Sequence, residues 1–406
     1  MLRSAEVIYL VKEKAQLYGV RGVDPDEITF DLAAAIARKD QVVQGIINVI
    51  YNGLERNKNI TFHTGKAEFT SPVDILVDGK SITAEKTIIA VGSRPFIPNI
   101  PGLGESGYLT NNEALQLREL LDSMVIIGGG YIGVEFAQMY RRFGTKVTLL
   151  GRAPRLMKKE EPELSESLAQ ILSQEGIEVH TSTEVLRAGK GDNKRFVIAN
   201  IDNKERRFES EVILMAAGRI ARVDDLGLEQ AGVEMDTGFI IANPNLQTSA
   251  DNIWTLGDAN GGYLFTHRAT YDGPIAAINA VKNAGRKVNY RVVPRVVFSE
   301  PALASVRMTE KEAKEAGYEV RTGIAYFKHS GRAKAIAQTE GAAKIVVNVA
   351  TDEILGGHIL GPHADDLIHE VVVAMQGGGK LETLTKSIHI HPTLSEVVKG
   401  AAKDAR

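Results

Sequence analysis

Cysteine is absent from all 406 residues of this sequence. Its absence excludes disulfide bonds, thiolate metal sites and cysteine nucleophiles within the chain. The sequence also lacks any apolar run long enough to span a membrane. Residues 1–14 carry Glu6 and Glu13 and lack a small-residue cleavage site, so we predict no signal peptide and expect a cytoplasmic location.

Charge of one sign is not in excess either, because the formal net charge is only -3 at pH 7. This balance gives no reason to expect nucleic acid or an anionic membrane as a partner. With 44% hydrophobic and 24% charged residues, the composition is that of an ordinary globular protein. A chain of this length is too long for one ordinary core, so we expect two or three domains.

A glycine-rich stretch in the middle of the chain gives the first specific indication. Residues 124–127 are apolar and predict a buried strand, and Gly128, Gly130 and Gly133 then form G-x-G-x-x-G before a helical pattern and a second apolar strand at 146–150. The glycines permit a tight turn, the approach of a pyrophosphate, and close packing of helix on strand. The helix N-terminus would offer N–H groups to the phosphates. The alternative is a glycine-rich turn in some other α/β protein.

Two further predicted strands end at glycine. The strand at 86–90 runs through Ala90 into Gly92 and then Pro95, a tight exit that is found beside ligands and equally in plain loops. The strand at 212–217 ends at Gly218. We take Ala90, Gly92 and Gly218 as candidate cofactor-binding positions.

A third strand, at 253–256, ends in Gly257 and Asp258. A carboxylate just beyond the end of a parallel strand lies where open α/β sheets bind ligands, so Asp258 could bond a ribityl or ribose hydroxyl. The alternative is an Asp that caps the turn. A predicted helix over 266–283 then begins at Thr266 and His267, where backbone N–H groups can face an electron-rich ring.

The remaining pattern predicts one long helix, short strands and a separate C-terminal region. Asp31 is a predicted N-cap, Asp78-Gly79 a hairpin turn, and Asn112 the cap of a short helix. Further strands are predicted at 60–62, 73–77, 81–83, 177–180, 292–298, 303–306, 320–327, 344–349 and 354–360, and further helices at 4–18, 163–175, 310–316, 365–376 and 394–402. After residue 288 the elements lack regular βα alternation, which favours an α+β domain.

The last constellation contains a histidine and a glutamate. Pro392 suits the first turn of a helix, which would put His391 at the start of that helix and Glu396 one turn further in. A histidine oriented by a carboxylate is the usual build of a general acid–base pair. The alternative is a surface pair.

Four of these stretches occur together in the order found in a known family. They are Thr87 to Pro95 (TIIAVGSRP), Gly128 to Glu135 (GGGYIGVE), Thr255 to Asp258 (TLGD) and His391 to Glu396 (HPTLSE). On these residues the chain resembles the class I flavoprotein disulfide reductases, which include dihydrolipoamide dehydrogenase, glutathione reductase and mercuric reductase. The resemblance covers essentially the whole chain.

The resemblance implies an α/β fold with two Rossmann-like dinucleotide-binding domains and a C-terminal α+β dimerisation domain. It places an FAD-binding domain at 1–118 and 246–288, an NAD(P)-binding domain at 119–245 and the dimerisation domain at 289–406. FAD would be held partly through Gly257 and Asp258. The family forms homodimers.

The resemblance also implies a path for electrons. NAD(P)H would dock at Gly128, Gly130 and Gly133, beside a gating aromatic that here is Tyr131. Hydride would pass to the flavin and electrons onward to a redox disulfide and a small-molecule or protein-bound disulfide substrate. His391, positioned by Glu396, would act as acid–base partner for the thiol in the active site of the other subunit.

The sequence departs from the family at its start. The first strand, its own FAD fingerprint and the C-x-x-x-x-C redox pair are missing, and a lysine that pairs with Glu135 in the family is missing too. We therefore expect little or no reductase activity from these 406 residues. The alternative to a complete enzyme is a truncated nucleotide-binding dimer module without a redox cycle.

The second strand of the nucleotide motif bears on the cofactor. Where NADH-specific enzymes carry an acidic residue, this chain has Gly151, then Arg152, with Arg155 close by. Guanidinium groups suit a 2′-phosphate, which favours NADPH over NADH, although a solvent-facing Arg152 is the alternative. For the substrate, lipoamide is the first expectation, and a mercuric, other metal-ion or quinone reductase of the same build stays open.

Overall fold

The computed structural model describes all 406 residues and divides into two compact units. The first unit combines residues 1–39, 97–217 and 291–406, and the second combines residues 40–96 and 218–290. Each unit has hydrophobic clusters of its own. None of the helices has both the length and the apolar composition that crossing a membrane requires.

The chain begins with a helical segment in three parts. Helix α1 (Leu2–Tyr9) continues as a π-helical turn at Leu10–Lys14 and a 3-10 turn at Ala15–Tyr18, and Gly19 ends it with a φ of 80°. The prediction of a helix over 4–18 is therefore confirmed. The change from α-helical to π-helical and 3-10 hydrogen bonds within it was not predicted. Helix α2 (Leu32–Arg56) follows, and Asp31 caps it as predicted by accepting a bond of 2.9 Å from the Ala34 N–H.

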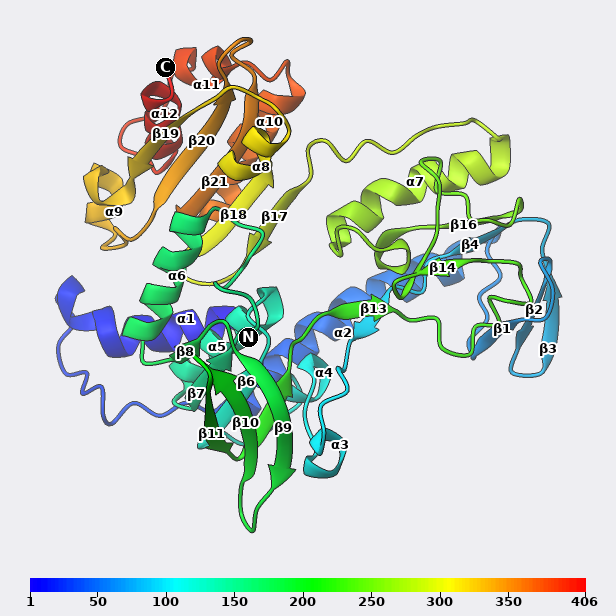
Figure 1. Ribbon diagram of the computed structural model, residues 1–406, viewed down its shortest axis with the longest axis horizontal. Helices are drawn as coiled ribbons and strands as arrows, with labels where there is room; N and C mark the ends of the chain where they lie inside the picture. The colour runs from blue at the N-terminus through cyan, green and yellow to red at the C-terminus, as the bar shows by residue number, and fades with distance from the viewer. The chain divides into compact units, whose positions relative to one another are not determined.

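A parallel sheet forms one half of the first unit (Figure 1). Its strand order is β12-β6-β7-β8, with bounds Val212–Met215, Ser123–Ile127, Lys146–Leu150 and Glu178–His180. Helices α5 (Tyr131–Phe143) and α6 (Pro162–Gln174) are the crossovers between its strands. Strands β6 and β12 are entirely buried, which accounts for their unbroken apolar sequences.

Smaller elements accompany this sheet. An antiparallel side sheet contains β9 (Glu184–Lys190), β10 (Arg195–Ile201) and β11 (Lys204–Ser210), in the order β11-β10-β9. The short helices α3 (Leu103–Ser106) and α4 (Asn111–Ala114) precede β6. The cap of α4 is Thr110, in a capping box with Glu113, so the prediction of Asn112 as the cap is wrong. Thr110 has the β-branched hydroxyl and the Glu three residues later that this box requires.

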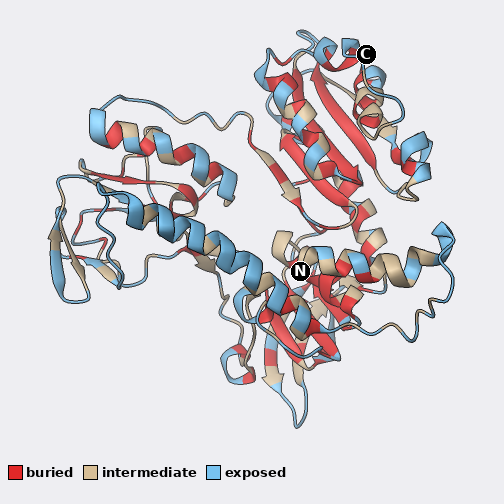
Figure 2. Ribbon diagram, turned by 180° about the vertical axis from the view of Figure 1, so that it is seen from behind, coloured by how far each residue is buried: buried red, intermediate tan, exposed pale blue.

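The other half of the first unit is an antiparallel sheet in the order β17-β18-β21-β20-β19. Its strands are Pro294–Val297, Ala302–Arg307, Ile354–Gly361, Ala342–Asn348 and Val320–Tyr326 in that order. Strands β20 and β21 are completely buried, as their red colour in Figure 2 shows. Helix α10 packs on β18 and β21, and α12 packs on β19 and β20.

The helices of this half only partly follow the predicted ranges. They are α8 (Glu310–Glu315), α9 (Gly331–Ala335), α10 (Ala364–Gln376), α11 (Leu381–Lys386) and α12 (Ser395–Asp404). Helices α9 and α11 were not predicted. The prediction that Pro392 lies in the first turn of α12 is wrong, since that helix begins at Ser395 and Pro392 follows a cis peptide bond.

Besides residues 40–56 of helix α2, the second unit contains short strands and one further long helix. The strands are β1 (Ala67–Phe69), β2 (Asp74–Val77), β3 (Lys80–Thr83), β4 (Thr87–Ile89), β5 (Ser93–Pro95), β13 (Arg219–Ala221), β14 (Met235–Asp236), β15 (Phe239–Ile240) and β16 (Ile253–Thr255), and the helix is α7 (Thr266–Lys282). Asp78 and Gly79 form the predicted turn between β2 and β3, both with positive φ. The strand predicted at 60–62 is absent, because no neighbouring strand pairs with it.

Buried charges join the two halves of the first unit. Lys344 of β20 is 3% exposed and its ammonium lies 3.0 Å from Glu161, 2.5 Å from Glu163 and 2.8 Å from Glu310. Burial opposes its charge, but the three carboxylates raise the pKa of Lys344 above its ordinary value. Beside this cluster, the Arg295 guanidinium pairs with Glu160 at 2.7 Å. The loop before α6 is thus fixed to the C-terminal sheet by two consecutive carboxylates.

Removing the cation of this cluster should strongly destabilise the first unit. In Lys344→Met the buried Glu161 carboxylate loses its cationic partner and keeps only the hydrogen bond from the Glu310 N–H, so we expect the free energy of unfolding to fall by about 3 to 5 kcal/mol. Urea denaturation followed by circular dichroism measures this change. The control is Lys311→Met, which breaks an exposed pair with Glu315 and should cost no more than about 1 kcal/mol. Equal losses in the two variants would contradict the structural role of Lys344.

Candidate functional site

The turn between β6 and α5 imposes different demands on its three glycines. Gly128 has a φ of 132°, and a Cβ there would lie 2.1 Å from the carbonyl oxygen of Ala216. A Cβ on Gly133 would lie 1.8 Å from the carbonyl oxygen of Gly128. Gly130 has a φ of -95°, which any residue adopts, and a Cβ there would meet nothing within 4 Å. The fold itself therefore requires glycine at two positions and leaves the third unexplained.

The start of α5 fits the diphosphate of a dinucleotide. Gly130 is the N-cap and supplies no side-chain bond to the first turn. The N–H groups of that turn and the positive end of the helix dipole consequently remain available to an anion. A glycine with open space in front of this helix end is what a closely approaching phosphate needs.

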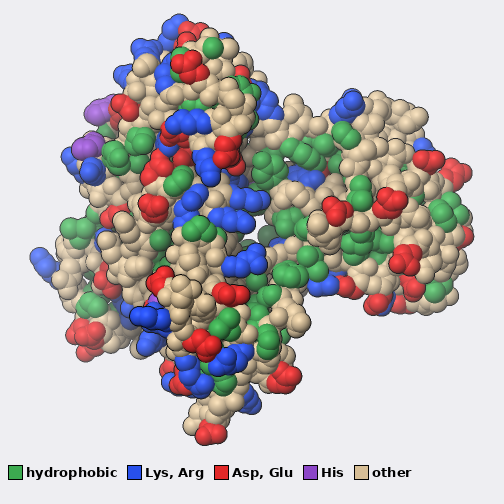
Figure 3. Space-filling view, viewed as in Figure 1, with side chains coloured by type: hydrophobic (Ala, Val, Ile, Leu, Met, Phe, Trp, Pro, Cys, Tyr) green, Lys and Arg blue, Asp and Glu red, His purple; other side chains and the backbone are tan.

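The loop after β7 is rich in cations. Arg152 is exposed directly after Gly151, as are Lys158 and Lys159 further along the loop. Arg155 is half-buried and donates to the carbonyl oxygen of Lys158 at 3.3 Å. Figure 3 shows Lys and Arg side chains gathered on this unit just below β17 and β18 as these strands are placed in Figure 1. Lys158 was not predicted as a cofactor-binding residue. Its only indication in the sequence was that it lies close to Arg152 and Arg155.

Glu135 lies one turn of α5 beyond Tyr131 and is half-buried. Its Oε1 accepts a bond of 3.0 Å from the Phe298 N–H, and burial raises the pKa of the carboxyl above its ordinary value. No Lys or Arg forms an ion pair with it.

The second unit brings several predicted residues together. Strands β4 and β16 are parallel neighbours, so Gly92 and Asp258 follow the same edge of this pair. Ser93 donates from Oγ to the Asp258 carboxylate at 2.5 Å, and Arg219 donates from Nε to Ser93 Oγ at 2.7 Å. Gly257 has a φ of 64°, and a Cβ there would lie 2.9 Å from that of Ala269. Asp258 is therefore part of a hydrogen-bonded group at the strand ends.

Other predicted positions of this unit lie at the margins of that group. Ala90 is exposed at the end of β4, and Gly218 has a φ of 128° immediately before β13. Thr266 and His267 form the exposed first turn of α7, as predicted, and the His267 ring stacks on Phe265 at 5.1 Å between ring centroids.

Two buried residues that we did not predict support the turn at Gly257. Asp272 is fully buried, accepts from the Gly257 N–H at 3.2 Å, and accepts from the Tyr290 hydroxyl at 2.7 Å. Arg268 pairs with Asp272 and donates to Asn260 at 2.5 Å. In the sequence, the only indication of this contact was that an Arg and an Asp lie four residues apart on one predicted helix. Two residues at this spacing usually form an exposed ion pair.

His391 and Glu396 are in contact, as expected from their sequence spacing. The Nδ1 atom of His391 lies 3.0 Å from Glu396 Oε1, and the imidazole is largely exposed. The hydrogen bond from His391 holds the pKa of the Glu396 carboxyl below its ordinary value, aided by the Thr393 N–H. A second pair, His389 with Glu370 of α10, lies beside it and was not predicted.

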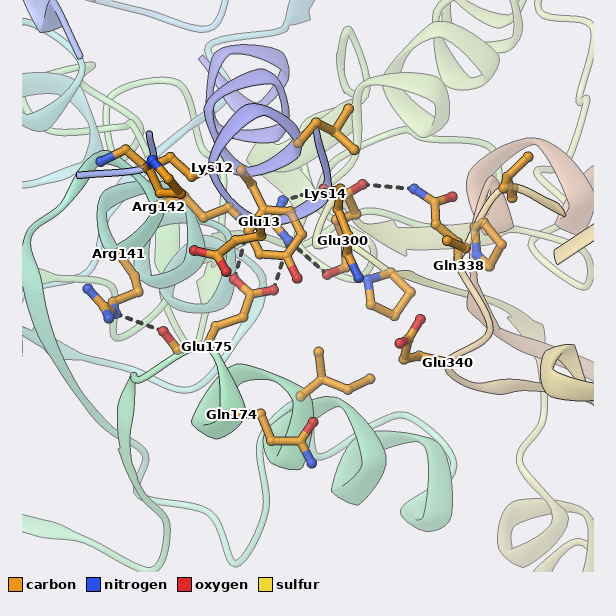
Figure 4. Close-up of a pocket in the computed structure, with 18 of the residues that line it drawn as sticks. Lys12, Glu13, Lys14, Arg141, Arg142, Gln174, Glu175, Glu300, Gln338 and Glu340 are labelled. Carbon is orange, nitrogen blue, oxygen red and sulfur yellow. Dashed lines mark hydrogen bonds and ion pairs between the residues drawn. The ribbon is translucent and has the colours of Figure 1, made fainter. Parts of the chain in front are cut away.

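A cavity of about 510 Å³ in the first unit contains none of the predicted site residues (Figure 4). Its wall carries Arg142, which pairs with Glu175 at 2.7 Å and also with Glu300. Gln338 donates to Glu300 at 3.1 Å. Because these charges neutralise one another, the cavity presents no clear preference for an anion or a cation.

Comparison with known proteins identifies the family. Residues 8–284 match the family described as pyridine nucleotide-disulphide oxidoreductase, and residues 293–402 match its dimerisation domain. The chain belongs to the pyridine nucleotide-disulphide oxidoreductases. Members of this family are flavoproteins that use FAD and a nicotinamide nucleotide, and the dimerisation domain indicates a homodimer. The predicted family and the mixed α/β fold are thus confirmed.

Three relatives show how far the likeness extends. A mercuric reductase of Staphylococcus aureus is 35% identical over 99% of this chain and 73% of its own length. A dihydrolipoyl dehydrogenase of Chlorobaculum tepidum is 36% identical over 100% of this chain and 87% of its own length. The Cu(II) complex of RclA, an HOCl-induced flavoprotein disulfide reductase of Escherichia coli, superposes with a TM-score of 0.87 at 29% identity, over 99% of this chain and 89% of that one.

The glycines of the β6–α5 turn give a test that separates fold from binding. In Gly133→Ala the new Cβ collides with backbone, so we expect a loss of about 1 to 3 kcal/mol in the free energy of unfolding. In Gly130→Ala the fold should be unchanged to within about 1 kcal/mol, while NADPH affinity falls roughly tenfold. Denaturation and calorimetric titration measure the two effects. Full affinity in Gly130→Ala would exclude a close phosphate at this turn.

Proposed function

We propose that this oxidoreductase binds NADPH on the first unit, with the diphosphate at Gly128, Gly130 and Gly133. The observation that carries the proposal is Gly130, whose conformation and surroundings would accept any small side chain. A residue type that the protein itself does not need is accounted for by a ligand that approaches the backbone. The uncapped start of α5 supports the same position.

NADPH is preferred over NADH in this proposal because of the loop after β7. Arg152 and Lys158 are exposed there, and Gly151 takes the place where NADH-specific enzymes use a carboxylate. A 2′-phosphate would bind these cations, whereas the 2′-hydroxyl of NADH has no acidic acceptor at that place.

Replacing Arg152 tests this preference. We expect Arg152→Gln to weaken NADPH binding about tenfold and to leave NADH binding nearly unchanged, because one charge-assisted contact is lost. Calorimetric titration with both nucleotides measures the two dissociation constants. Arg187→Gln, an exposed Arg of the side sheet, is the matched control and should change neither. Tighter binding of NADH than NADPH by the unmodified chain would contradict the proposal.

For FAD, we propose that Asp258 and Gly257 hold part of the cofactor in the second unit. Asp258 has a carboxylate oxygen for a ribityl or ribose hydroxyl and is fixed by Ser93. Gly257 is held by buried Asp272, so the turn is rigid. Glu396 and His391 would serve a dithiol as an acid–base pair, a role that their exposed contact supports.

We further propose that these 406 residues alone do not reduce a disulfide. The chain contains no cysteine, so no thiol pair within it can receive electrons from a flavin. The candidate substrates remain lipoamide or another disulfide, and Hg(II) or a quinone as alternatives; the His391–Glu396 pair favours the disulfide, because it suits proton transfer to and from a thiol.

This part of the proposal predicts an outcome for the chain itself. Purified protein supplemented with FAD and NADPH should not oxidise NADPH above background when lipoamide is added. Absorbance at 340 nm follows the reaction, and titration calorimetry on the same sample confirms that nucleotide still binds. Turnover with lipoamide would contradict the proposal, while turnover with Hg(II) or a quinone alone would favour that alternative.

A further inference from the structure

The spacing of the glycine motif does not account for Gly129, which lies between Gly128 and Gly130. Its φ is outside the left-handed region, so the backbone conformation does not require glycine either. A Cβ on Gly129 would lie 2.8 Å from Leu156 Cδ2 and 3.3 Å from Gly151 Cα. The absence of a side chain at Gly129 therefore lets the loop after β7 pack directly on the β6–α5 turn.

Two residues anchor the middle of this loop on the turn. The Leu156 side chain is completely buried, and the Met157 N–H donates to the Gly129 carbonyl oxygen at 2.9 Å. Met157 has a φ of 45°, which residues other than glycine rarely adopt, and it is buried as well. The Leu156 carbonyl oxygen accepts from the Ser165 hydroxyl of α6. Such a conformation persists only where the surrounding contacts fix it, so this part of the loop has one position.

The start of the loop is anchored on the parallel sheet. The Gly151 N–H donates to the His180 carbonyl oxygen at 2.7 Å, and the Gly151 carbonyl oxygen accepts from the Thr183 N–H at 2.9 Å. Arg152 directly follows this first anchor, and Lys158 directly follows Met157, the second anchor. Both exposed cations are thus attached to fixed backbone, which sets their distance from the glycine turn before any ligand binds.

We propose that Leu156 determines the selectivity for a 2′-phosphate by holding the cationic loop against Gly129. This inference rests on the proposed NADPH site. Leu156 is a positioning residue, because a completely buried side chain acts on the nucleotide only through Arg152 and Lys158. Cations that are already in place need no ordering when the ligand arrives, which favours the ligand that contacts them. NADH has no 2′-phosphate and gains little from this arrangement.

Leu156→Ala tests the inference by loosening the loop. We expect the dissociation constant of NADPH to rise about five- to tenfold and that of NADH to rise less than about twofold, because only NADPH uses the cations. Calorimetric titration with each nucleotide gives the ratio of the two constants. Leu172→Ala is the matched control, since Leu172 is also completely buried and belongs to the same hydrophobic cluster, on α6. It should destabilise the fold without changing the ratio.

Two further variants show whether the effect depends on this contact and on the cations. Gly129→Ala creates no cavity, but its Cβ would collide with Leu156 Cδ2, so the selectivity for NADPH should fall here too. In the background Arg152→Gln/Lys158→Gln, adding Leu156→Ala should leave the ratio unchanged, because the groups through which Leu156 acts are already gone. If Leu156→Ala does not fold, Gly129→Ala supplies the decisive ratio.

The outcomes separate this inference from the proposed function. A selective loss of NADPH affinity in Leu156→Ala and Gly129→Ala, with an unchanged ratio in Leu172→Ala, supports both. An unchanged ratio in Leu156→Ala and Gly129→Ala, or an equal fall in the control, overturns the role of Leu156 and leaves the nucleotide site standing. If the unmodified chain binds NADPH no more tightly than NADH, the proposed preference is overturned, and the inference with it.

Discussion

Two consecutive buried carboxylates, Glu160 and Glu161, hold the first unit together. Glu160 is paired with Arg295 and Glu161 with Lys344, and both cations belong to the C-terminal sheet. Burying four charges is favourable only when each has a partner, so the loop that carries the carboxylates has one acceptable position. That loop begins at Gly151, and its path sets where Arg152, Arg155 and Lys158 meet solvent. The loop after β7 and the C-terminal sheet are therefore joined by two buried ion pairs.

The glycine turn between β6 and α5 is the part of the candidate site that could be predicted from the sequence. The succession of strand, G-x-G-x-x-G and helix predicted the turn correctly because these three features are consecutive in the sequence. The spacing alone would have misled: Gly102, Gly104 and Gly107 repeat it, but there the chain forms only the short helix α3 and no parallel strand leads into it. The structural context, and not the spacing, carries the signal.

The residues that escaped prediction share a physical cause. Asp272 and Arg268 support the Gly257 turn, Arg295 holds Glu160, and Glu370 holds His389, and each works through a contact that only the folded chain creates. The residues of a buried polar network do not recur at a regular spacing in the sequence. An analysis of hydrophobic periodicity therefore cannot identify them. The same limit explains Pro392, where the local preference of proline for a helix start was overridden and α12 begins at Ser395. The boundaries of the proposed FAD-binding, NAD(P)-binding and dimerisation domains stay a prediction.

Backbone hydrogen exchange measured with and without NADPH tests the central claim most directly, because it maps the nucleotide onto the chain. Our interpretation predicts slower exchange for the amides of residues 128–133 and for the loop of residues 151–159 when NADPH is added, with a smaller effect from NADH. Protection confined to residues 257–267, or no protection anywhere, would contradict a nucleotide site at the β6–α5 turn.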